Sequence, residues 1–237
     1  MKSNFVFKNR ILKSLPQKES RIILPHLRQV WLPKNHVLSE AGERIREILF
    51  PDEALISYMA GTSEGESIEV CVVGNEGAVD LGALLSQRTA FRAVVQIPGQ
   101  AYVISTDILR KEFGRCDVVH EVLLRYTGAL LAQLAQTAVC NQFHSIEQRF
   151  CRWLLMASDR MRSKDLPMTQ DAVARILGSR RASISGSAGK LQKKGFIRYN
   201  RGVISILDRK SIETECCECY ETIAAAHENL ALAKPGS

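Results

Sequence analysis

The sequence has no long apolar run. No stretch approaches the roughly 18 consecutive apolar residues of a membrane-spanning helix, and residues 1–13, MKSNFVFKNRILK, lack the apolar core of a signal peptide. We therefore expect a cytoplasmic protein without a membrane partner. At 237 residues, 46% of them hydrophobic and 24% charged, the chain is long enough for one or two ordinary domains.

Motifs of enzyme chemistry are also scarce. No glycine-rich loop joins a predicted strand to a helix, and the segment VGNEG, with Gly74 and Gly77, lacks the helix that a nucleotide-binding loop requires. No paired zinc-ligand motif is present. We therefore expect a protein that is not an enzyme and that holds no cofactor. The seven cysteines are an odd number, which argues against the disulfide framework of a secreted domain and indicates reduced thiols.

Residues 166–207 are the most informative part of the chain. A first helix is predicted to begin at Thr169, whose hydroxyl can cap the free amides, and to end at Gly178. A second helix follows over about residues 180–194, with Gly195 where a left-handed cap would lie. Two β-prone runs, FIRY and VISIL, come next, and the turn Asn-Arg-Gly between them suits a hairpin. This order is typical of a winged helix-turn-helix.

The outward face of the second predicted helix is small and basic. It contains Ser183 and Ser185, with Arg180 and Arg181 at the amino end and Lys190 towards the other end. Small residues let a helix approach base edges in the major groove, and basic residues can reach phosphates or a guanine edge. These five residues are our candidates for a DNA-reading surface.

Positive charge is concentrated around this module. Residues 141–210 hold 15 Lys and Arg against 5 Asp and Glu, a net charge of +10, whereas the whole chain has +7. A compact basic module is the electrostatic pattern of a protein that displaces counterions from nucleic acid. The charge therefore favours double-stranded DNA as the partner. A basic face that contacts another protein is the alternative.

The amino-terminal part has a different pattern. Between about residues 27 and 105 the sequence contains short β-prone runs separated by turn clusters, namely VWLP, REILF, LISYM, IEVCVV, AVVQI and AYVIS. Many short strands at close spacing predict a β-barrel or jelly-roll. A long helix is predicted over about residues 117–141.

Two apolar rows run along this long helix. The first contains Val119, Leu123, Tyr126 and Leu130, and the second contains Leu124, Leu131, Leu134 and Ala138. One row is enough to pack the helix on its own domain, so the second needs another cover, and a partner helix in a coiled-coil-like seam is the economical choice. We predict a homodimer with helix contacts at Val119, Leu123, Tyr126, Leu130 and Leu134. A helix wholly buried within one subunit is the alternative.

The predicted fold class is α+β, with an amino-terminal β-barrel or jelly-roll sensor domain, a long dimerisation helix and a carboxyl-terminal winged helix-turn-helix. The predicted boundaries are 1–115 for the sensor domain, 116–142 for the helix, 143–222 for the DNA-binding domain and 223–237 for a tail. This order of parts resembles the Crp/Fnr superfamily of bacterial transcription regulators.

The resemblance covers about residues 20–220. The segments VLSEAGERIREILFP, at 37–51, and IEVCVVGNEGAVDL, at 68–81, are similar to the sensor domain of the superfamily, and SRRASISGSAGKLQKKGFIRYNRGVISILD is similar to its recognition helix and wing. The resemblance implies a sequence-specific transcription regulator, a homodimer on a palindromic operator with half-sites about one helical turn apart. It also implies RNA polymerase as a partner.

The base-reading positions of the family are only partly present. Members often use an Arg-Glu pair at the start of the recognition helix and an Arg one turn later, where this chain has Arg181, Ala182 and Gly186. Only Arg181 is retained, and its planar fork can contact guanine. The operator is therefore expected to differ from the best-known family sequence. The resemblance further implies phosphate contacts at Thr169, Gln170 and Arg201.

The resemblance also implies an effector pocket, at Asp80, Leu81, Arg88 and Thr89. Cyclic-nucleotide sensors hold the ribose with a Gly-Glu pair, and the glutamate is missing here. They hold the cyclic phosphate with an Arg that is followed by Ser or Thr and then by Ala. Arg88-Thr89-Ala90 matches this pattern of residue types, but Arg88 lies one residue away from the expected position. We therefore expect a sensor domain that does not bind cyclic AMP and that responds to another ligand or to no ligand.

Cys216, Cys217 and Cys219, in ETECCECYET, are the remaining candidates for chemistry. Three thiols on one turn can bind a soft metal or act as a redox switch, but no second ligand pair lies nearby in sequence. The alternative, which we favour, is that they pack the last helix as small apolar residues. We predict no metal site. A thiol-based redox or metal sensor and a regulatory module whose winged element contacts protein remain alternative functions.

Overall fold

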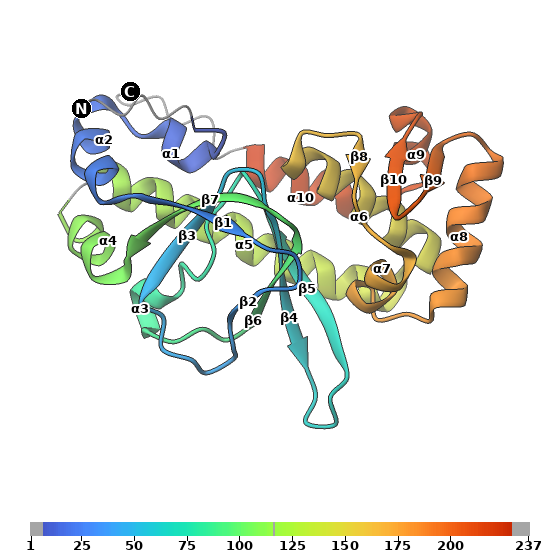
Figure 1. The fold of residues 1–237 in the computed structure, drawn as a ribbon, viewed down its shortest axis with the longest axis horizontal. Coiled ribbons are helices and arrows are strands. Elements are labelled where there is room, and N and C mark those ends of the chain that lie inside the picture. The colour runs from blue at the N-terminus through green and yellow to red at the C-terminus, as the bar shows by residue number, and fades with distance from the viewer. Residues whose placement is uncertain (1–6, 116, 229–237) are drawn as a thin grey trace.

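The computed structural model describes residues 7–115 and 117–228 as an α+β fold in three parts (Figure 1). A domain of antiparallel sheets is followed by a long helix, α5 (Asp117–Phe143), and by a winged helix-turn-helix. The predicted fold class is confirmed. The described strands of the amino-terminal domain form two sheets in a jelly-roll-like arrangement and not a closed barrel.

The two sheets of the amino-terminal domain enclose an apolar core. One sheet has the order β1-β7-β3 and the other β2-β6-β4-β5, so strands far apart in sequence are paired. Alternate side chains of these strands point inwards, and Ile56, Val73, Val95 and Val103 are buried among them. The strands are β1 (Arg28–Leu32), β2 (Val37–Ser39), β3 (Glu47–Pro51), β4 (Leu55–Gly61), β5 (Ser67–Val73), β6 (Arg92–Ile97) and β7 (Gly99–Ser105).

Short helices surround one end of this domain. Figure 1 shows α1, α2 and α4 gathered near the start of α5. Asn9 begins α1 by accepting a hydrogen bond from the Leu12 amide, and it places Ile11 and Leu12 in a second apolar cluster with Ile48 and Ile104. The helices are α1 (Arg10–Ser14), α2 (Gln17–Ile23), the 3-10 helix η1 (Leu24–His26), α3 (Ala83–Ser86) and α4 (Thr106–Phe113).

One face of α5 packs against its own domain. Val119, Leu123 and Tyr126 are buried in the same cluster as α1 and the sheet, and Leu130 and Leu134 are partly buried beside it. Of the five residues that we predicted as dimer contacts, three are therefore buried within one chain and two are partly buried. The exposed apolar row lies on the opposite face and includes Leu124, Gly128, Leu131, Ala135 and Ala138.

The carboxyl-terminal domain begins at Ser145, and only His144 separates this residue from the end of α5. Ser145 opens α6 with a capping box to Gln148, and the buried face of α6 carries Phe150, Trp153 and Leu154. These side chains share one apolar cluster with residues of the amino-terminal sheets. The elements are α6 (Ile146–Met161), β8 (Asp165–Leu166), α7 (Gln170–Ile176), α8 (Arg181–Lys193), β9 (Ile197–Asn200), β10 (Val203–Ile206), α9 (Arg209–Glu215) and α10 (Cys219–Glu228).

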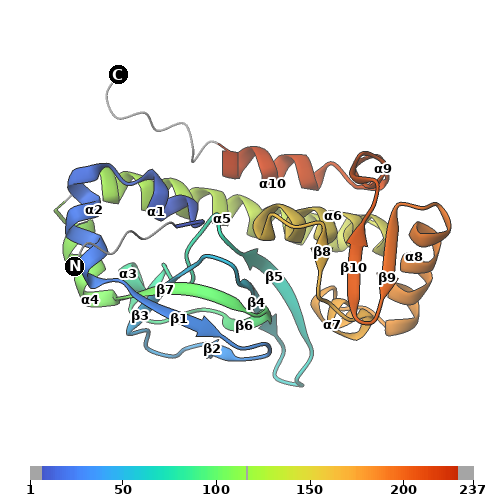
Figure 2. The same cartoon turned by 45° about the horizontal axis from the view of Figure 1, so that its top comes forward.

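The last described helix, α10, returns along α5 and α6 (Figure 2). Ile223 and His227 are its buried residues beyond Cys219. The sequence predicts a tail from residue 223, but α10 continues to Glu228 because its apolar face packs against α5 and α6. Residues 229–237 of the predicted tail lie outside the described part of the chain. Although α5 has 27 residues, no helix in the described ranges has the length and apolar character to cross a membrane.

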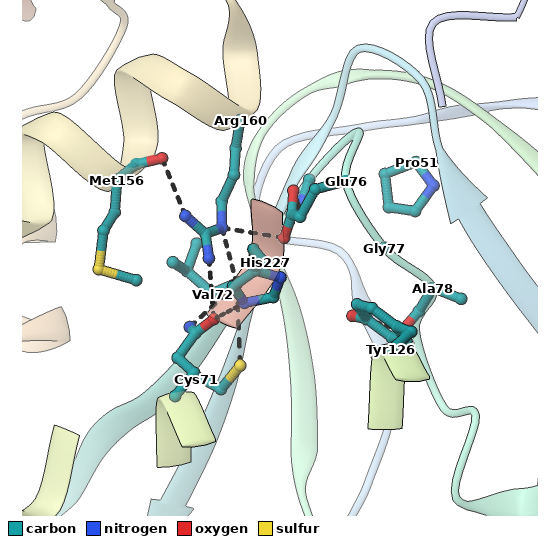
Figure 3. Close-up of polar contacts among 12 residues, drawn as sticks. Pro51, Cys71, Val72, Glu76, Gly77, Ala78, Tyr126, Met156, Arg160 and His227 are labelled. Carbon is teal, nitrogen blue, oxygen red and sulfur yellow. Dashed lines mark hydrogen bonds and ion pairs between the residues drawn. The ribbon is translucent and has the colours of Figure 1, made fainter. Parts of the chain in front are cut away.

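A buried ion pair joins the two domains. The Arg160 side chain of α6 lies 2.9 Å from Glu76, in the loop after β5, and both side chains are almost fully buried. The guanidinium also donates to the carbonyl of Val72 at 3.1 Å and to that of Met156 at 3.3 Å (Figure 3). It makes a further hydrogen bond, 2.8 Å long, to the side chain of Gln133 on α5.

The buried His227 of α10 extends this network. Its Nε2 donates to Gln133 Oε1 at 3.0 Å, which is the oxygen that also accepts from Arg160. Burial, together with the nearby charge of Arg160, lowers the pKa of His227 to about 3. The imidazole is therefore neutral in the folded protein at pH 7.

We expect Arg160→Ala to lower the free energy of unfolding by about 3–5 kcal/mol, because the buried Glu76 carboxylate loses its partner. Urea titration monitored by circular dichroism measures the change. The control is Arg92→Ala, which removes an exposed pair to Glu40 and should cost less than about 1 kcal/mol. Equal effects of the two substitutions would contradict the role assigned to Arg160.

We expect His227 to make the protein less stable in acid. The unfolded chain takes up a proton near pH 6.5, which the folded chain does not do until about pH 3, so stability is lost as the pH falls below about 6.5. The loss approaches about 1.4 kcal/mol per pH unit. In urea titrations from pH 7 to 4.5, His227→Gln should lose less stability than the wild type. Parallel losses in the two proteins would refute this assignment.

Candidate nucleic-acid interface

The helix-turn-helix is formed by α7, a four-residue turn and α8. Thr169 caps α7 through its side-chain oxygen, which accepts from the Ala172 amide at 3.2 Å. In the turn Gly178 has φ +55°, and a Cβ there would lie 2.9 Å from Ile68 Cδ1 of β5. The left-handed backbone therefore favours glycine, and a larger residue would also require the end of the Ile68 side chain to move. Arg180 is the N-cap residue of α8.

The two faces of α8 differ as the sequence suggested. Ile184, Ala188 and Leu191 are buried against the domain core. The opposite face exposes Arg181, Ala182, Ser183 and Gly186, whereas Ser185 is half-buried. A Cβ at Gly186 or Gly189 would meet nothing within 4 Å, so packing within this chain does not require either glycine.

The amino-terminal turns of α7 and α8 contact each other through polar side chains. Arg181 Nε lies 3.2 Å from Asp171 Oδ1, with both side chains largely exposed. Ser185 Oγ donates to Gln170 Oε1 at 2.5 Å. The structure thus brings Gln170, Arg181 and Ser185 together at one surface. The sequence analysis missed Asp171, although its place in the first turn of a helix, two residues after the cap, favours an acidic residue.

Lys190 lies apart from this group. Its ammonium pairs with Glu147 of α6, which places it on the side of α8 that faces the first turn of α6. The wing presents a different basic surface: Arg201, with φ +47°, occupies the exposed β9–β10 turn next to Gly202. Arg198, which we did not predict, is exposed on β9; its alternation with the buried Ile197 was the available signal.

The four predicted effector residues do not form one pocket. Asp80 and Thr89 are both buried, and burial raises the pKa of Asp80 although the nearby hydroxyls of Ser39 and Thr89 oppose that shift. Leu81 points into the apolar cluster beneath α5. Arg88 is exposed and donates to the carbonyl of Gly42 at 2.5 Å. The separation of Arg88 from Asp80 follows from the short helix α3, which lies between them in the chain.

Tyr126 fills the space between α5 and the loop after β5 (Figure 3). The hydroxyl of Tyr126 donates to the Ala78 carbonyl at 3.2 Å. A Cβ at Gly77 would lie 2.2 Å from the hydroxyl oxygen of Tyr126. Asp80 lines an open cavity that does not include Tyr126 or Gly77. It has a volume of about 650 Å³ and is lined mainly by β1, β2 and the segment before β3, including Trp31, Arg44 and Arg46.

The predicted cysteines separate into two groups. Cys217 and Cys219 converge with Cys140 of α5 and with His144, the residue after α5, whereas Cys216 lies outside that set, with its Sγ 4.0 Å from the Gln148 carbonyl. The sequence analysis missed Cys140 and His144. Their spacing of four residues, which places both on one face of a helix, was the signal that could have linked them.

A family model describes residues 148–214 as a Crp-like helix-turn-helix domain. No curated protein matches the chain in sequence. Several solved structures share the fold. One is assigned to the Crp/Fnr family of transcriptional regulators in Eubacterium rectale ATCC 33656; it is 18% identical, with a TM-score of 0.64 over 88% of this chain and 98% of that one.

Two further structures resemble the chain to a similar degree. FixK2 from Bradyrhizobium japonicum is 14% identical, with a TM-score of 0.66 over 81% of this chain and 98% of its own. CLP, a c-di-GMP responsive global regulator from Xanthomonas campestris, is 15% identical, with a TM-score of 0.63 over 78% and 96%. The chain thus contains a Crp-like helix-turn-helix domain at residues 148–214 and shares its fold with Crp/Fnr regulators.

Proposed function

We propose that this protein is a sequence-specific DNA-binding transcription regulator that acts as a homodimer on a palindromic operator. The observation that carries the proposal is the exposed face of α8, where small residues follow Arg181 and no side chain among the described residues covers Ala182, Ser183 or Gly186. A helix with such a face can enter the major groove to the depth that base contacts need.

Arg181 is the base-reading residue of this proposal. Its pair with Asp171 is exposed and therefore worth at most about 1 kcal/mol, so the guanidinium can exchange the carboxylate for the O6 and N7 atoms of guanine at little cost. The Asp171 carboxylate then stays beside the arginine and orients it. Thr169, Gln170, Arg180, Ser183 and Ser185 complete the surface, and Arg198 and Arg201 of the wing reach phosphates.

The exposed face of α5 supports the dimer. Leu124, Gly128, Leu131, Ala135 and Ala138 follow one another at intervals of four, three, four and three residues, and all five are exposed. This is the spacing of a coiled-coil seam, in which small residues let two helices approach closely. A large leucine such as Leu131, which is 61% exposed, is costly to leave in water.

Cyclic AMP is not the effector in this proposal. Arg88 is exposed and hydrogen-bonded to Gly42 whereas Asp80 is buried, and Tyr126 occupies the space between α5 and the loop that carries Asp80. RNA polymerase is the expected further partner, and the cytoplasm is the expected compartment.

Selection of bound sites from random duplex DNA tests the function directly. We expect the full chain to enrich an inverted repeat, with affinity that falls steeply between two salt concentrations because phosphate contacts release counterions. Added cyclic AMP should leave the enriched sequence and the affinity unchanged. Absence of any enriched sequence would contradict the proposal.

We expect Arg181→Ala to relax discrimination at one base pair of each half-site by about 1–3 kcal/mol. Arg201→Ala should instead weaken binding to all sequences alike and reduce the salt dependence by about one phosphate contact. Fluorescence anisotropy with the selected site, its single-base variants and a random duplex measures both. The assignment of Arg181 fails if its substitution weakens selected and random DNA equally.

We expect Leu131→Glu to convert the dimer to a monomer, because two carboxylates would face each other in an apolar seam. Analytical ultracentrifugation over a range of concentrations measures the mass. Leu85→Glu is the matched control, since Leu85 is a still more exposed leucine on α3, away from the seam. A wild-type monomer, or a Leu131→Glu protein that dimerises like the control, would show that this face is not the interface.

A further inference from the structure

Four metal-ligating side chains converge where α10 meets the end of α5. Cys140 comes from the last turn of α5 and His144 directly follows that helix, and Cys217 and Cys219 come from the junction of α9 and α10. Their ligand atoms, three sulfurs and one ring nitrogen, all lie within 4.8 Å of one another. We call these four residues the thiol–imidazole cluster.

The distances suit a single ion. Cys140 Sγ lies 3.6 Å from Cys217 Sγ, and Cys219 Sγ lies 3.3 Å from His144 Nδ1. The two sulfurs are much farther apart than the roughly 2.05 Å of a disulfide. They are close to the edge of about 3.8 Å that a tetrahedron has when the Zn–S bonds are about 2.3 Å long.

The cluster is enclosed by protein. Cys140, Cys217 and Cys219 are buried and His144 is half-buried. Four protein ligands leave no open position for water or substrate, which is the arrangement of a structural metal site and not of a catalytic one. The spacing of four residues between Cys140 and His144 places both on the face of α5 that receives α10.

Outer side chains orient the ligands as metal sites require. Nε2 of His144, the ring nitrogen that faces away from the sulfurs, lies 3.3 Å from the Glu218 carboxylate. A carboxylate in this position fixes the tautomer that leaves Nδ1 free to bind a metal. Gln136 Nε2 donates to Cys219 Sγ at 3.1 Å, a hydrogen bond that favours the thiolate.

The local charge also favours thiolates. Three thiolates, a neutral imidazole and a divalent ion carry one net negative charge. Arg152 is buried nearby, its charge acts on Cys140, and its Nε has no hydrogen-bond partner among the described residues.

We propose that Cys140, His144, Cys217 and Cys219 bind one Zn²⁺ ion in a tetrahedral site. Soft thiolate ligands with one imidazole select zinc among the common divalent ions. An iron–sulfur cluster would place its own irons and sulfides between the ligands, which cannot then all lie within 4.8 Å of one another. The site was not apparent from the sequence because its two ligand pairs lie more than seventy residues apart.

The ion would join α10 to α5 directly before the DNA-binding domain. His144 immediately precedes Ser145, the cap of α6, and the first turns of α6 contact both helices of the helix-turn-helix. Glu147 pairs with Lys190 of α8, and Arg149 donates to the Leu177 carbonyl at the end of α7, at 2.5 Å. Metal binding thus stabilises the segment that positions α8. This inference does not depend on DNA binding.

Cobalt substitution of the full-length protein tests the site. The reduced chain, stripped of metal with a chelator, is titrated anaerobically with Co²⁺. We expect one Co²⁺ per chain, with the visible bands of tetrahedral cobalt and sulfur-to-cobalt charge transfer, and complete displacement by one equivalent of Zn²⁺. Chain mass and metal content are measured on the same sample.

Substitutions assign the ligands. Cys217→Ser and His144→Ala should abolish the stoichiometric absorption, whereas Cys216→Ser, at the adjacent thiol outside the cluster, should retain it. Glu218→Ala alters only an exposed side chain and should weaken the affinity for Zn²⁺ by about 10–100-fold in competition with a chelator. This variant keeps the test decisive if a buried substitution prevents folding, which circular dichroism detects.

Four results would overturn the proposal. They are the absence of cobalt absorption in the wild-type chain, an equal loss in Cys216→Ser and Cys217→Ser, iron with acid-labile sulfide in anaerobically purified protein, and unchanged zinc affinity in Glu218→Ala.

Discussion

The buried ion pair between Arg160 and Glu76 is the constraint on which the arrangement of the two domains depends. A guanidinium cannot lose its proton, so once it is buried each of its donors must find an acceptor. Here the acceptors come from the loop after β5, from α5 and from α6 itself. Satisfying one side chain therefore fixes three elements relative to one another. Gly74 completes the fit, because a Cβ there would lie 2.6 Å from that of Arg160.

This constraint places α5 and α6 so that the two ends of α5 have different roles. At the amino-terminal half, Tyr126 and its apolar neighbours fill the space against the sheets, so a ligand could enter there only by displacing them. At the carboxyl-terminal end, the thiol–imidazole cluster is already assembled beside the start of α6. Its four ligand atoms already lie within 4.8 Å of one another, so the proposed ion would need only small movements of the side chains. The physical route from such an ion to the recognition helix is short, since α6 contacts both α7 and α8 in its first turns.

The local features of the fold could be predicted from the sequence because they depend on neighbouring residues. Periodicity and turn chemistry identified the helix-turn-helix, its wing and the short-stranded sheets, and Thr169 caps α7 as its position predicted. The choice of dimer contacts on α5 could not be made in the same way. Both apolar rows have helical spacing, and only the folded chain shows that Val119, Leu123 and Tyr126 are covered by their own domain.

The contacts between distant segments were equally hidden. Arg160 and Glu76 are ordinary charged residues in the sequence, and nothing in their neighbourhood indicates that they meet. Cys140 and His144 lie at the end of a long helix whose apolar pattern indicated dimer contacts and not a metal site. Cys217 and Cys219 have no second ligand pair nearby in the sequence. Arg88 had the right letters for a phosphate site, but α3 separates it from Asp80. In each case the missing information was the tertiary arrangement and not the residue type.

The central claim, that two copies of this chain read one palindrome through α8 while paired along α5, predicts a fixed distance between two half-sites. The direct measurement is the affinity of the full-length protein for duplexes in which the separation of the selected half-sites is varied one base pair at a time. We expect the affinity to have a sharp optimum near one helical turn, about 10–10.5 base pairs between half-site centres. Binding should be much weaker when one half-site is rotated to the opposite face of the duplex. Affinity that does not change with separation, or that is equal for a single half-site, would contradict it.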